Sequence, residues 1–268
     1  VRMTSYVAVE GHVLQVDTVL DDPFMRSIPN FITAEEALYL RELARKALGP
    51  SRVVTYGSSD ARSSTSCRVP RTDPVASRMI QRAEVLTGLP GTHVEPLQIV
   101  HYDPQQKYSP HFDYFNVDSP DYASHTARGG QRRFTLFVNL SGCDGGGATS
   151  FPTLEMSFPP IEGRCLFWSN RRPDGVMDKR TLHGGDVVTS GEKVHIAAPR
   201  VMCVQFGLNI WVRDGPWVQP TDPPESVFAP AFVLDNGSDD AEPRPTAPPL
   251  RVGSLPENAT TYTAPPPL

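Results

Sequence analysis

The sequence predicts a mainly β protein with flanking helices (α+β), built on a double-stranded β-helix (jelly roll) core with N-terminal helices packed on one sheet. Two observations favour this fold. Residues 33–88 contain two stretches of helical periodicity, whereas apolar residues recur with a period of two from Thr92 onward. Several short strands that follow one another without intervening helices are typical of an antiparallel sandwich or barrel.

Length and composition divide the 268 residues into three parts. Residues 1–22 are expected to form an N-terminal extension with one or two strands, because apolar residues alternate between Tyr6 and Val19. Residues 23–215 form the expected domain, which is large enough to bury about 70% of its unfolded surface. Residues 216–268 hold 13 of the 28 prolines, so we expect most of this tail to be disordered or to adopt polyproline II.

The composition also argues against several classes of protein. A net charge of −5 without any basic run is not typical of a nucleic-acid binder. No stretch of about 18 apolar residues is present, so we expect no membrane span. The four cysteines form no CxxC pair, which argues against a zinc ribbon or a disulfide framework and leaves one disulfide open. They are Cys67, Cys143, Cys165 and Cys203.

Both predicted helices have recognisable start and stop signals. Thr33-Ala34-Glu35-Glu36 matches a capping box, and Gly49-Pro50 follows the last apolar residue of the helical pattern. The second helix is expected to start at Asp73-Pro74, with the aspartate as cap and the proline at the first helical position. It should end at Gly88. Met79 lies on its apolar face and is expected in the core.

Four segments of the alternating region are predicted to be strands. Apolar and polar residues alternate in residues 97–102 and 134–140, and further apolar runs occupy residues 164–168 and 201–212. Turn-forming residues separate these segments. The polar stretch 58–66, between the two helices, is expected to be a loop.

Three side chains in the strand region form a candidate metal site. In an extended strand, residues two apart point to the same face, so His111 and Asp113 are expected to aim an imidazole and a carboxylate at one point. His183 offers a second imidazole. Two histidines and one carboxylate are the ligand set of a non-haem Fe(II) oxygenase. A catalytic zinc accepts the same ligands, but the chain has no HExxH motif, so the pattern favours iron.

Six ordered blocks of sequence surround or connect these three residues. They are residues 99–102, 106–115, 129–132, 146–152, 160–168 and 182–185. Together they resemble the core of the prolyl 4-hydroxylases, which are Fe(II)/2-oxoglutarate enzymes. The resemblance extends over roughly Phe24 to Val212 and does not include the proline-rich tail.

This resemblance implies a metal site and a co-substrate site. His111, Asp113 and His183 would bind Fe(II), with 2-oxoglutarate and O2 as co-substrates and ascorbate as a reductant. Tyr102 matches the tyrosine that hydrogen-bonds 2-oxoglutarate in the family. Lys193, ten residues after His183, has the family's spacing for the cation that binds the distal carboxylate of 2-oxoglutarate.

The position of this cation has two alternatives. The family usually has a tryptophan soon after the lysine, whereas here residues 205–211 look more like that final strand. If an insertion separates the two motifs, Gln205 takes the lysine's register and Arg200 becomes the nearest spare cation. We therefore expect Lys193 to bind the distal carboxylate, with Arg200 or Gln205 as alternatives.

The resemblance also implies residues on the substrate side. Arg132 and Tyr108 are expected to take part in the catalytic site. Arg62 and Ser63 match the family's substrate-covering loop, and Tyr108 and Tyr114 are expected to contact substrate because aromatic faces suit proline rings.

The function implied is hydroxylation of proline residues in peptides or proteins, coupled to decarboxylation of 2-oxoglutarate to succinate. The same chemistry on a lysyl or small-molecule substrate is one alternative, and a catalytically silent proline-peptide binding module on the same fold is another. A location in the endoplasmic reticulum or secretory pathway would follow only if the chain behaves as the eukaryotic members do. The tail, with Pro265-Pro266-Pro267, could itself enter such a substrate groove.

Overall fold

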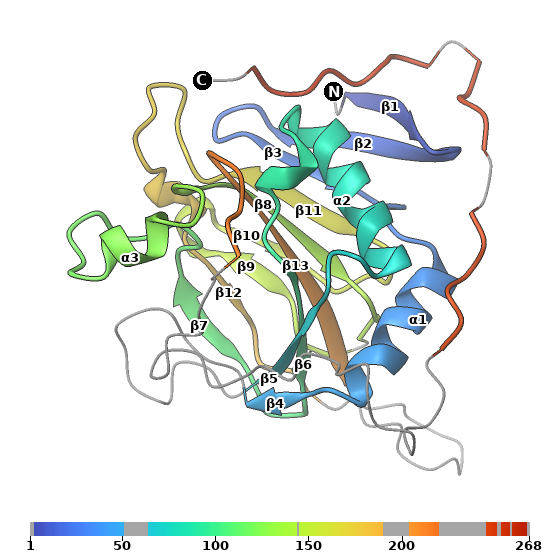
Figure 1. Ribbon diagram of the computed structural model, residues 1–268, viewed down its shortest axis with the longest axis horizontal. Coiled ribbons are helices and arrows are strands. Elements are labelled where there is room, and N and C mark those ends of the chain that lie inside the picture. The colour runs from blue at the N-terminus through green and yellow to red at the C-terminus, as the bar shows by residue number, and fades with distance from the viewer. Residues whose placement is uncertain are drawn as a thin grey trace.

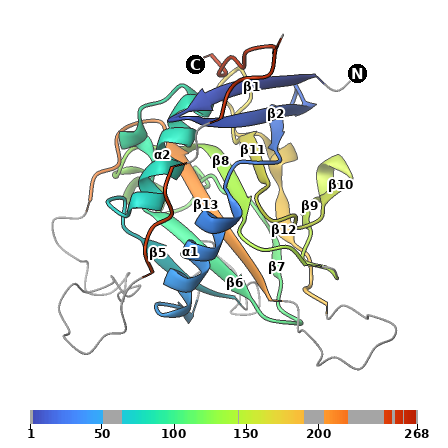
Figure 2. The same cartoon turned by 90° about the vertical axis from the view of Figure 1, so that its right-hand side faces the viewer.

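The computed structural model describes residues 3–50, 64–143, 145–189, 204–219, 245–250, 253–257 and 259–266. In this part of the chain, two long helices cover one face of a nine-stranded sheet, and a four-stranded sheet covers the other face (Figures 1 and 2). Every strand pair within the two sheets is antiparallel. The predicted jelly-roll core with helices on one sheet is confirmed.

The nine-stranded sheet, called the major sheet below, contains residues from both ends of the domain. Its strands, in spatial order, are β1 (Thr4–Val9), β2 (His12–Leu20), β3 (Met25–Ile28), β11 (Cys165–Ser169), β8 (Arg132–Asn139), β13 (Gln205–Arg213), β6 (Leu97–Tyr102), β5 (Thr65–Val69) and β4 (Gly49–Pro50). The four-stranded minor sheet follows the order β10 (Met156–Phe158), β9 (Thr149–Phe151), β12 (His183–Gly185) and β7 (Tyr108–His111).

The two long helices begin where their caps predict. In α1 (Ala34–Arg45), the Thr33 hydroxyl accepts from the amide of Glu36, whose carboxylate accepts in return from the amide of Thr33. In α2 (Pro74–Thr87), the Asp73 carboxylate accepts from two amides of the first turn, and Gly88 ends the helix in the left-handed conformation. Short helical segments are α3 (Tyr122–Thr126) and the 3-10 turns η2 (Gly91–His93), η3 (Pro152–Leu154) and η4 (Lys179–Thr181).

Each strand of the major sheet divides its residues between two faces. Leu97, Leu136 and Leu208 face α1 and α2, and they share a hydrophobic core with Leu40 and with the fully buried Met79. Burial of each such side chain is worth about 1.5–3 kcal/mol. The alternate residues of the same strands face the minor sheet, where a second cluster contains Met25, Phe151, Leu166 and Trp168. The alternation therefore sets which residues can reach a site between the sheets.

The N-terminal extension adds strands to the domain. β1 and β2 form a hairpin whose turn, Glu10-Gly11, has positive φ at both residues, as a tight two-residue turn requires. β2 then pairs with β3, so residues 4–20 continue the major sheet at one edge. The one or two strands expected here are thus two full strands.

Part of the proline-rich tail departs from the expected disorder. Its described residues, between 245 and 266, run along α2 and β1 (red in Figure 1). Tyr6 donates its amide to Thr260 and accepts from the amide of Tyr262, at 2.8 and 2.9 Å, which adds a parallel bridge to the edge of β1. The exposed edge of β1 offers these unpaired groups, and Tyr262 anchors the segment by packing on the core and donating its hydroxyl to the Leu86 carbonyl, 2.7 Å away. Residues 220–244 lie outside the described residues.

Three of the four cysteines lie among the described residues. Cys143 takes part in a disulfide, and the sequence had left room for one such bond. Cys67 and Cys165 are buried free thiols, and Cys203 lies outside the described residues.

Within the described part of the chain, no helix combines the length and the apolar character needed to cross a membrane.

Candidate active site

The three predicted metal ligands meet where β7 and β12 pair. His111 is the last residue of β7 and stands opposite His183, the first residue of β12, in the antiparallel register. Asp113 follows β7 by two residues. One donor atom from each of the three side chains lies within 4.8 Å of the other two. Pairing of the two strands therefore brings together side chains that are seventy positions apart in the sequence.

Backbone carbonyls orient both imidazole rings. His111 Nδ1 lies 3.0 Å from the Ser109 carbonyl oxygen, and His183 Nδ1 lies 3.0 Å from the Thr181 carbonyl oxygen. Because a carbonyl only accepts, each Nδ1 carries a hydrogen, and Nε2 is the nitrogen of each ring that faces Asp113. The Nε2 atoms lie 3.7 and 3.6 Å from the two Asp113 carboxylate oxygens, too far for a good hydrogen bond. This donor set fits a divalent metal ion between the three groups.

A chain of buried hydrogen bonds orients the carboxylate. The Thr135 hydroxyl donates to Asp113 Oδ2 at 2.8 Å and accepts from the Asn170 amide at 3.1 Å. Trp168 Nε1 donates in turn to Asn170 Oδ1 at 3.1 Å. Thr135 and Trp168 stand opposite each other on β8 and β11. Sequence reasoning missed this chain, although Thr135 occupies the non-core face of a predicted alternating strand.

The surroundings of Asp113 favour its ionised form. Burial, which is the largest single effect, would raise the pKa of this carboxyl group. The neighbouring His183, His111 and Arg132 and the hydrogen bond from Thr135 outweigh burial, so the pKa lies below its ordinary value. An ionised carboxylate is the form that ligates a metal ion.

The predicted co-substrate residues are only partly described. Tyr102 is buried at the end of β6, where it packs with Val188 and Tyr108. Its hydroxyl makes no hydrogen bond with the described residues. Gln205, opposite Tyr102 at the start of β13, is buried and donates its amide to the Gly147 carbonyl at 2.9 Å. Lys193 and Arg200 lie outside the described residues.

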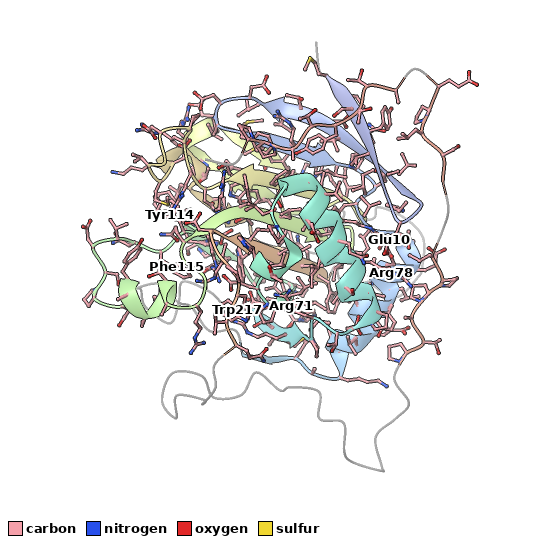
Figure 3. The ribbon with its side chains drawn as sticks, turned by 45° about the horizontal axis from the view of Figure 1, so that its top comes forward. Glu10, Arg71, Arg78, Tyr114, Phe115 and Trp217 are labelled. Carbon is pink, nitrogen blue, oxygen red and sulfur yellow. The ribbon has the colours of Figure 1, made fainter. Side chains whose placement is uncertain are left out.

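Two predicted substrate tyrosines are close in sequence to the predicted ligands His111 and Asp113, and one of them stacks on His111. The Tyr108 ring stacks on His111 with 3.6 Å between ring centroids, and the Tyr114 ring stacks on Phe112 at 4.7 Å. Tyr114, Phe115 and Trp217 lie on the side of the molecule that carries α3 (Figure 3). Burial, and to a lesser extent the Asp178 charge, raises the pKa of Tyr114, so its phenol is protonated at neutral pH.

Arg132 belongs to a buried ion-pair cluster next to the ligands. Its Nε and Nη2 atoms lie 2.7 and 3.0 Å from the two carboxylate oxygens of Glu95, and Arg213 Nε lies 2.8 Å from one of them. Arg132 Nη1 also donates to the Asp113 carbonyl at 3.3 Å. The guanidinium stacks over the Trp211 ring at 3.6 Å. Its predicted catalytic role stays a prediction. Glu95 was missed because its partners are distant in sequence.

Two predicted substrate residues, Arg62 and Ser63, lie outside the described residues. The structure places the Tyr108 ring against the predicted ligand His111, and it places Tyr114 on the side of the molecule that carries α3. The loop that is expected to cover the substrate is not among the described residues. The substrate roles of all four residues stay predictions.

Comparisons with known proteins match this geometry. Residues 97–207, which contain all three predicted metal ligands, match the model of the 2OG-Fe(II) oxygenase superfamily. Probable prolyl 4-hydroxylase 3 of Arabidopsis thaliana is 37% identical over 191 residues, or 61% of this chain and 64% of the relative. Probable prolyl 4-hydroxylase 10 of the same plant is 33% identical over 204 residues, or 66% of this chain and 68% of the relative.

Two further comparisons concern a longer subunit and a solved structure. Prolyl 4-hydroxylase subunit alpha-3 of Rattus norvegicus is 36% identical over 178 residues, which are 64% of this chain but only 32% of the subunit. The chain thus spans about two thirds of the plant relatives' length and about a third of this subunit's. The viral collagen prolyl hydroxylase of Paramecium Bursaria Chlorella virus-1, solved as its 2OG complex, shares the fold with a TM-score of 0.55 and 23% identity, over 72% of this chain and 98% of that chain. The chain belongs to the prolyl 4-hydroxylase family of 2-oxoglutarate–Fe(II) oxygenases.

Proposed function

We propose that this chain hydroxylates proline residues in peptides or proteins, consuming 2-oxoglutarate and O2 and releasing succinate. The observation that supports the proposal best is the convergence of His111, Asp113 and His183, whose donor atoms lie within 4.8 Å of one another. Bound Fe(II), together with 2-oxoglutarate and O2, supplies the oxidising power that inserts oxygen into an unactivated C–H bond. The family match favours iron over the zinc that the same ligands would accept.

The residues of the chain would hold the metal ion and leave room for the co-substrates. Two imidazoles and one carboxylate would bind the ion through three positions, so that further positions could accept other ligands. The carbonyls of Ser109 and Thr181 fix the two rings, and Thr135 fixes the carboxylate. Because Asp113 and His183 are almost fully buried, bulk water reaches the site poorly.

Binding of 2-oxoglutarate requires partners for its distal carboxylate. We assign one hydrogen bond to the Tyr102 hydroxyl, which has no partner among the described residues. Gln205 lies opposite but carries no charge, and its amide is engaged by Gly147. The cation is therefore Lys193 or Arg200. A charge-assisted hydrogen bond is worth about 1.5–3 kcal/mol, so loss of the true partner should raise the KM for 2-oxoglutarate by roughly 10- to 100-fold.

Substitution of each candidate cation tests this assignment. Lys193→Ala and Arg200→Ala should differ: one variant should require more 2-oxoglutarate for half-maximal succinate release, and the other should behave as the wild type. Equal KM values for both variants and the wild type would reject both residues.

Substrate selection is assigned to the aromatic side of the site. Tyr108 and Tyr114 present ring faces of the kind that bind proline rings in extended peptides, and Arg62 and Ser63 would cover the bound peptide. Ascorbate is proposed as the reductant that maintains ferrous iron.

The decisive experiment measures succinate release and proline hydroxylation together. The protein is incubated with Fe(II), 2-oxoglutarate, ascorbate and a panel of proline-containing peptides, and mass spectrometry detects the gain of one oxygen atom on proline. His183→Ala should abolish both products. Succinate release with a lysyl or small-molecule substrate alone would reject proline as the target. Peptide binding that survives iron chelation, without any succinate, would instead indicate a silent binding module.

A further inference from the structure

An arginine that makes no hydrogen bond or ion pair with the described residues lies on the active-site face of the major sheet. In β5, the residues on both sides of Arg68, Cys67 and Val69, are buried in the core under the helices. Because neighbouring residues of a strand point to opposite faces, Arg68 points away from the helices. Its side chain is partly buried there.

The residues beside Arg68 connect this face to the metal site. Arg68 is paired in register with Gln98 of β6. Val100 and Tyr102, which share the face of Gln98 by alternation, pack with Tyr108, whose ring stacks on the ligand His111. Arg68 therefore lies on the same face of the sheet as residues that pack beside the predicted metal ligand His111.

In the described part of the chain, the polar groups next to Arg68 bond to one another and not to its guanidinium. Gln98 donates to the Ser66 hydroxyl at 3.4 Å and accepts from the Asn209 amide at 3.2 Å, so these three side chains satisfy one another. Among the described residues, Arg68 makes no hydrogen bond and no ion pair. An unpaired charge in a partly buried position is costly unless a ligand satisfies it.

The nearby charges are predominantly positive. The carboxylate that acts most strongly on Arg68 is that of Glu95, but Arg132 and Arg213 already bond to its oxygens. We call Arg68, Arg132 and Arg213 the arginine cluster. Two guanidinium groups bond to the Glu95 carboxylate and Arg68 lies within its electrostatic influence, so positive charges outnumber this carboxylate on a face of a protein whose net charge is −5. Burial is the main cause of the lowered pKa of Arg68, because burial disfavours the charged form of the guanidinium.

We propose that Arg68 binds an acidic side chain of the substrate, so that this enzyme prefers prolines with a neighbouring aspartate or glutamate. The inference rests on the proposed function and specifies its substrate class. The charges that act on Arg68 are those of Glu95, Arg132 and Arg128, and Arg132 is the first residue of β8. The expected 2-oxoglutarate partner, Tyr102, lies four residues beyond Gln98 along β6, roughly 13 Å away. The position of Arg68 therefore suits the substrate better than the co-substrate.

A scanning set of peptides tests the proposal. In one proline peptide, a glutamine or asparagine is replaced by glutamate or aspartate at successive positions on either side of the target proline. The ratio of kcat/KM for the acidic and the neutral peptide is measured at each position. For the wild type, we expect a ratio of roughly 10 or more at one position, as a charge-assisted bidentate hydrogen bond supplies.

Variants of Arg68 should change this ratio in a defined order. Arg68→Lys keeps the charge but loses the bidentate geometry, so the ratio should fall in part. Arg68→Gln should bring it close to one, and Arg68→Glu should favour a peptide with lysine at the same position. Arg45→Gln is the matched control, because it removes the same charge from an exposed position on α1, and it should keep the wild-type ratio. Thermal unfolding confirms that each variant is folded.

The opposite results would overturn the proposal. A wild-type ratio near one at every position, or a ratio retained in Arg68→Gln, shows that Arg68 does not read an acidic residue. A higher KM for 2-oxoglutarate in Arg68→Gln, with the ratio unchanged, assigns the arginine to the co-substrate instead. If no proline peptide is hydroxylated, the proposed function fails separately. Fluorescence anisotropy of labelled acidic and neutral peptides, repeated with Arg68→Gln, then decides by binding alone.

Discussion

Thr135→Val tests the hydrogen-bond chain that orients the carboxylate ligand. Valine has almost the shape of threonine, so the change removes the hydroxyl without leaving a large cavity. It removes the bond to Asp113 Oδ2 at 2.8 Å and leaves the Asn170 amide without its acceptor at 3.1 Å. Because Thr135 is completely buried, water has little access to replace the lost group.

The expected loss follows from the charge of the acceptor. A hydrogen bond to a charged group contributes about 1.5–3 kcal/mol, and loss of such an outer partner typically weakens metal binding by about 10- to 100-fold. We therefore expect Thr135→Val to reduce metal affinity within this range. The imidazole ligands keep their own carbonyl partners, Ser109 and Thr181, so binding should be weakened and not abolished.

Titration of the metal-free protein with Mn(II), followed by calorimetry, measures this affinity without any turnover. Thr87→Val is the matched control. Thr87 is equally a buried threonine, and its hydroxyl donates to the Ala83 carbonyl within α2. The control should lose some stability but bind Mn(II) as the wild type does. Wild-type affinity in Thr135→Val would refute the assigned role of the hydrogen-bond chain.

Three further predictions follow from other contacts. Asn170→Ala should weaken Mn(II) binding less than Thr135→Val does, because the hydroxyl still bonds to the ligand; equal or greater weakening would contradict this order. The pKa of Glu95 is lowered from 4.5 to about 2, because its arginine partners outweigh burial, so its stabilising effect is present above pH 4.5 and is lost as the pH falls toward about 2. The free energy of unfolding, measured with urea at pH 5 and pH 3, should therefore fall less between these two pH values in Glu95→Gln than in the wild type. An equal fall in both proteins would reject the stabilising role of the Glu95 carboxylate. Tyr262→Phe removes the hydrogen bond to the Leu86 carbonyl and should lower the free energy of unfolding by about 0.5–1.5 kcal/mol, with wild-type stability as the contrary result.

Local signals account for the parts of the fold that the sequence predicted well. The cap residues Thr33 and Asp73 bond to amides within their own first turns, so neighbouring residues alone decide where α1 and α2 begin. The alternation in residues 97–102 and 134–140 likewise separates the core face from the site face within each strand. His111 and Asp113 could be paired because their spacing is a property of one short segment.

Features that depend on distant pairing could not be read from the sequence. Docking of the tail requires the free edge of β1 and a carbonyl of α2, neither of which the composition of the tail reveals. The link from Trp168 to Asp113 exists only because β8 and β11 pair in one register. Glu95 and Arg132 are 37 positions apart. The sequence supplied the residues in each case, but strand order supplied the contacts.

The two faces of the major sheet place different demands on the residues that occupy them. The face under the helices carries apolar residues, and a polar residue there would have to give up water without a partner. The opposite face already holds paired polar groups, such as Gln98 and Asn209, so a charged side chain can be added to it at a smaller cost. Arg68 occupies such a position between two core residues of the same strand. If Arg68 has the proposed role, a substitution at this position should change which peptide is bound while the core beneath the sheet remains intact.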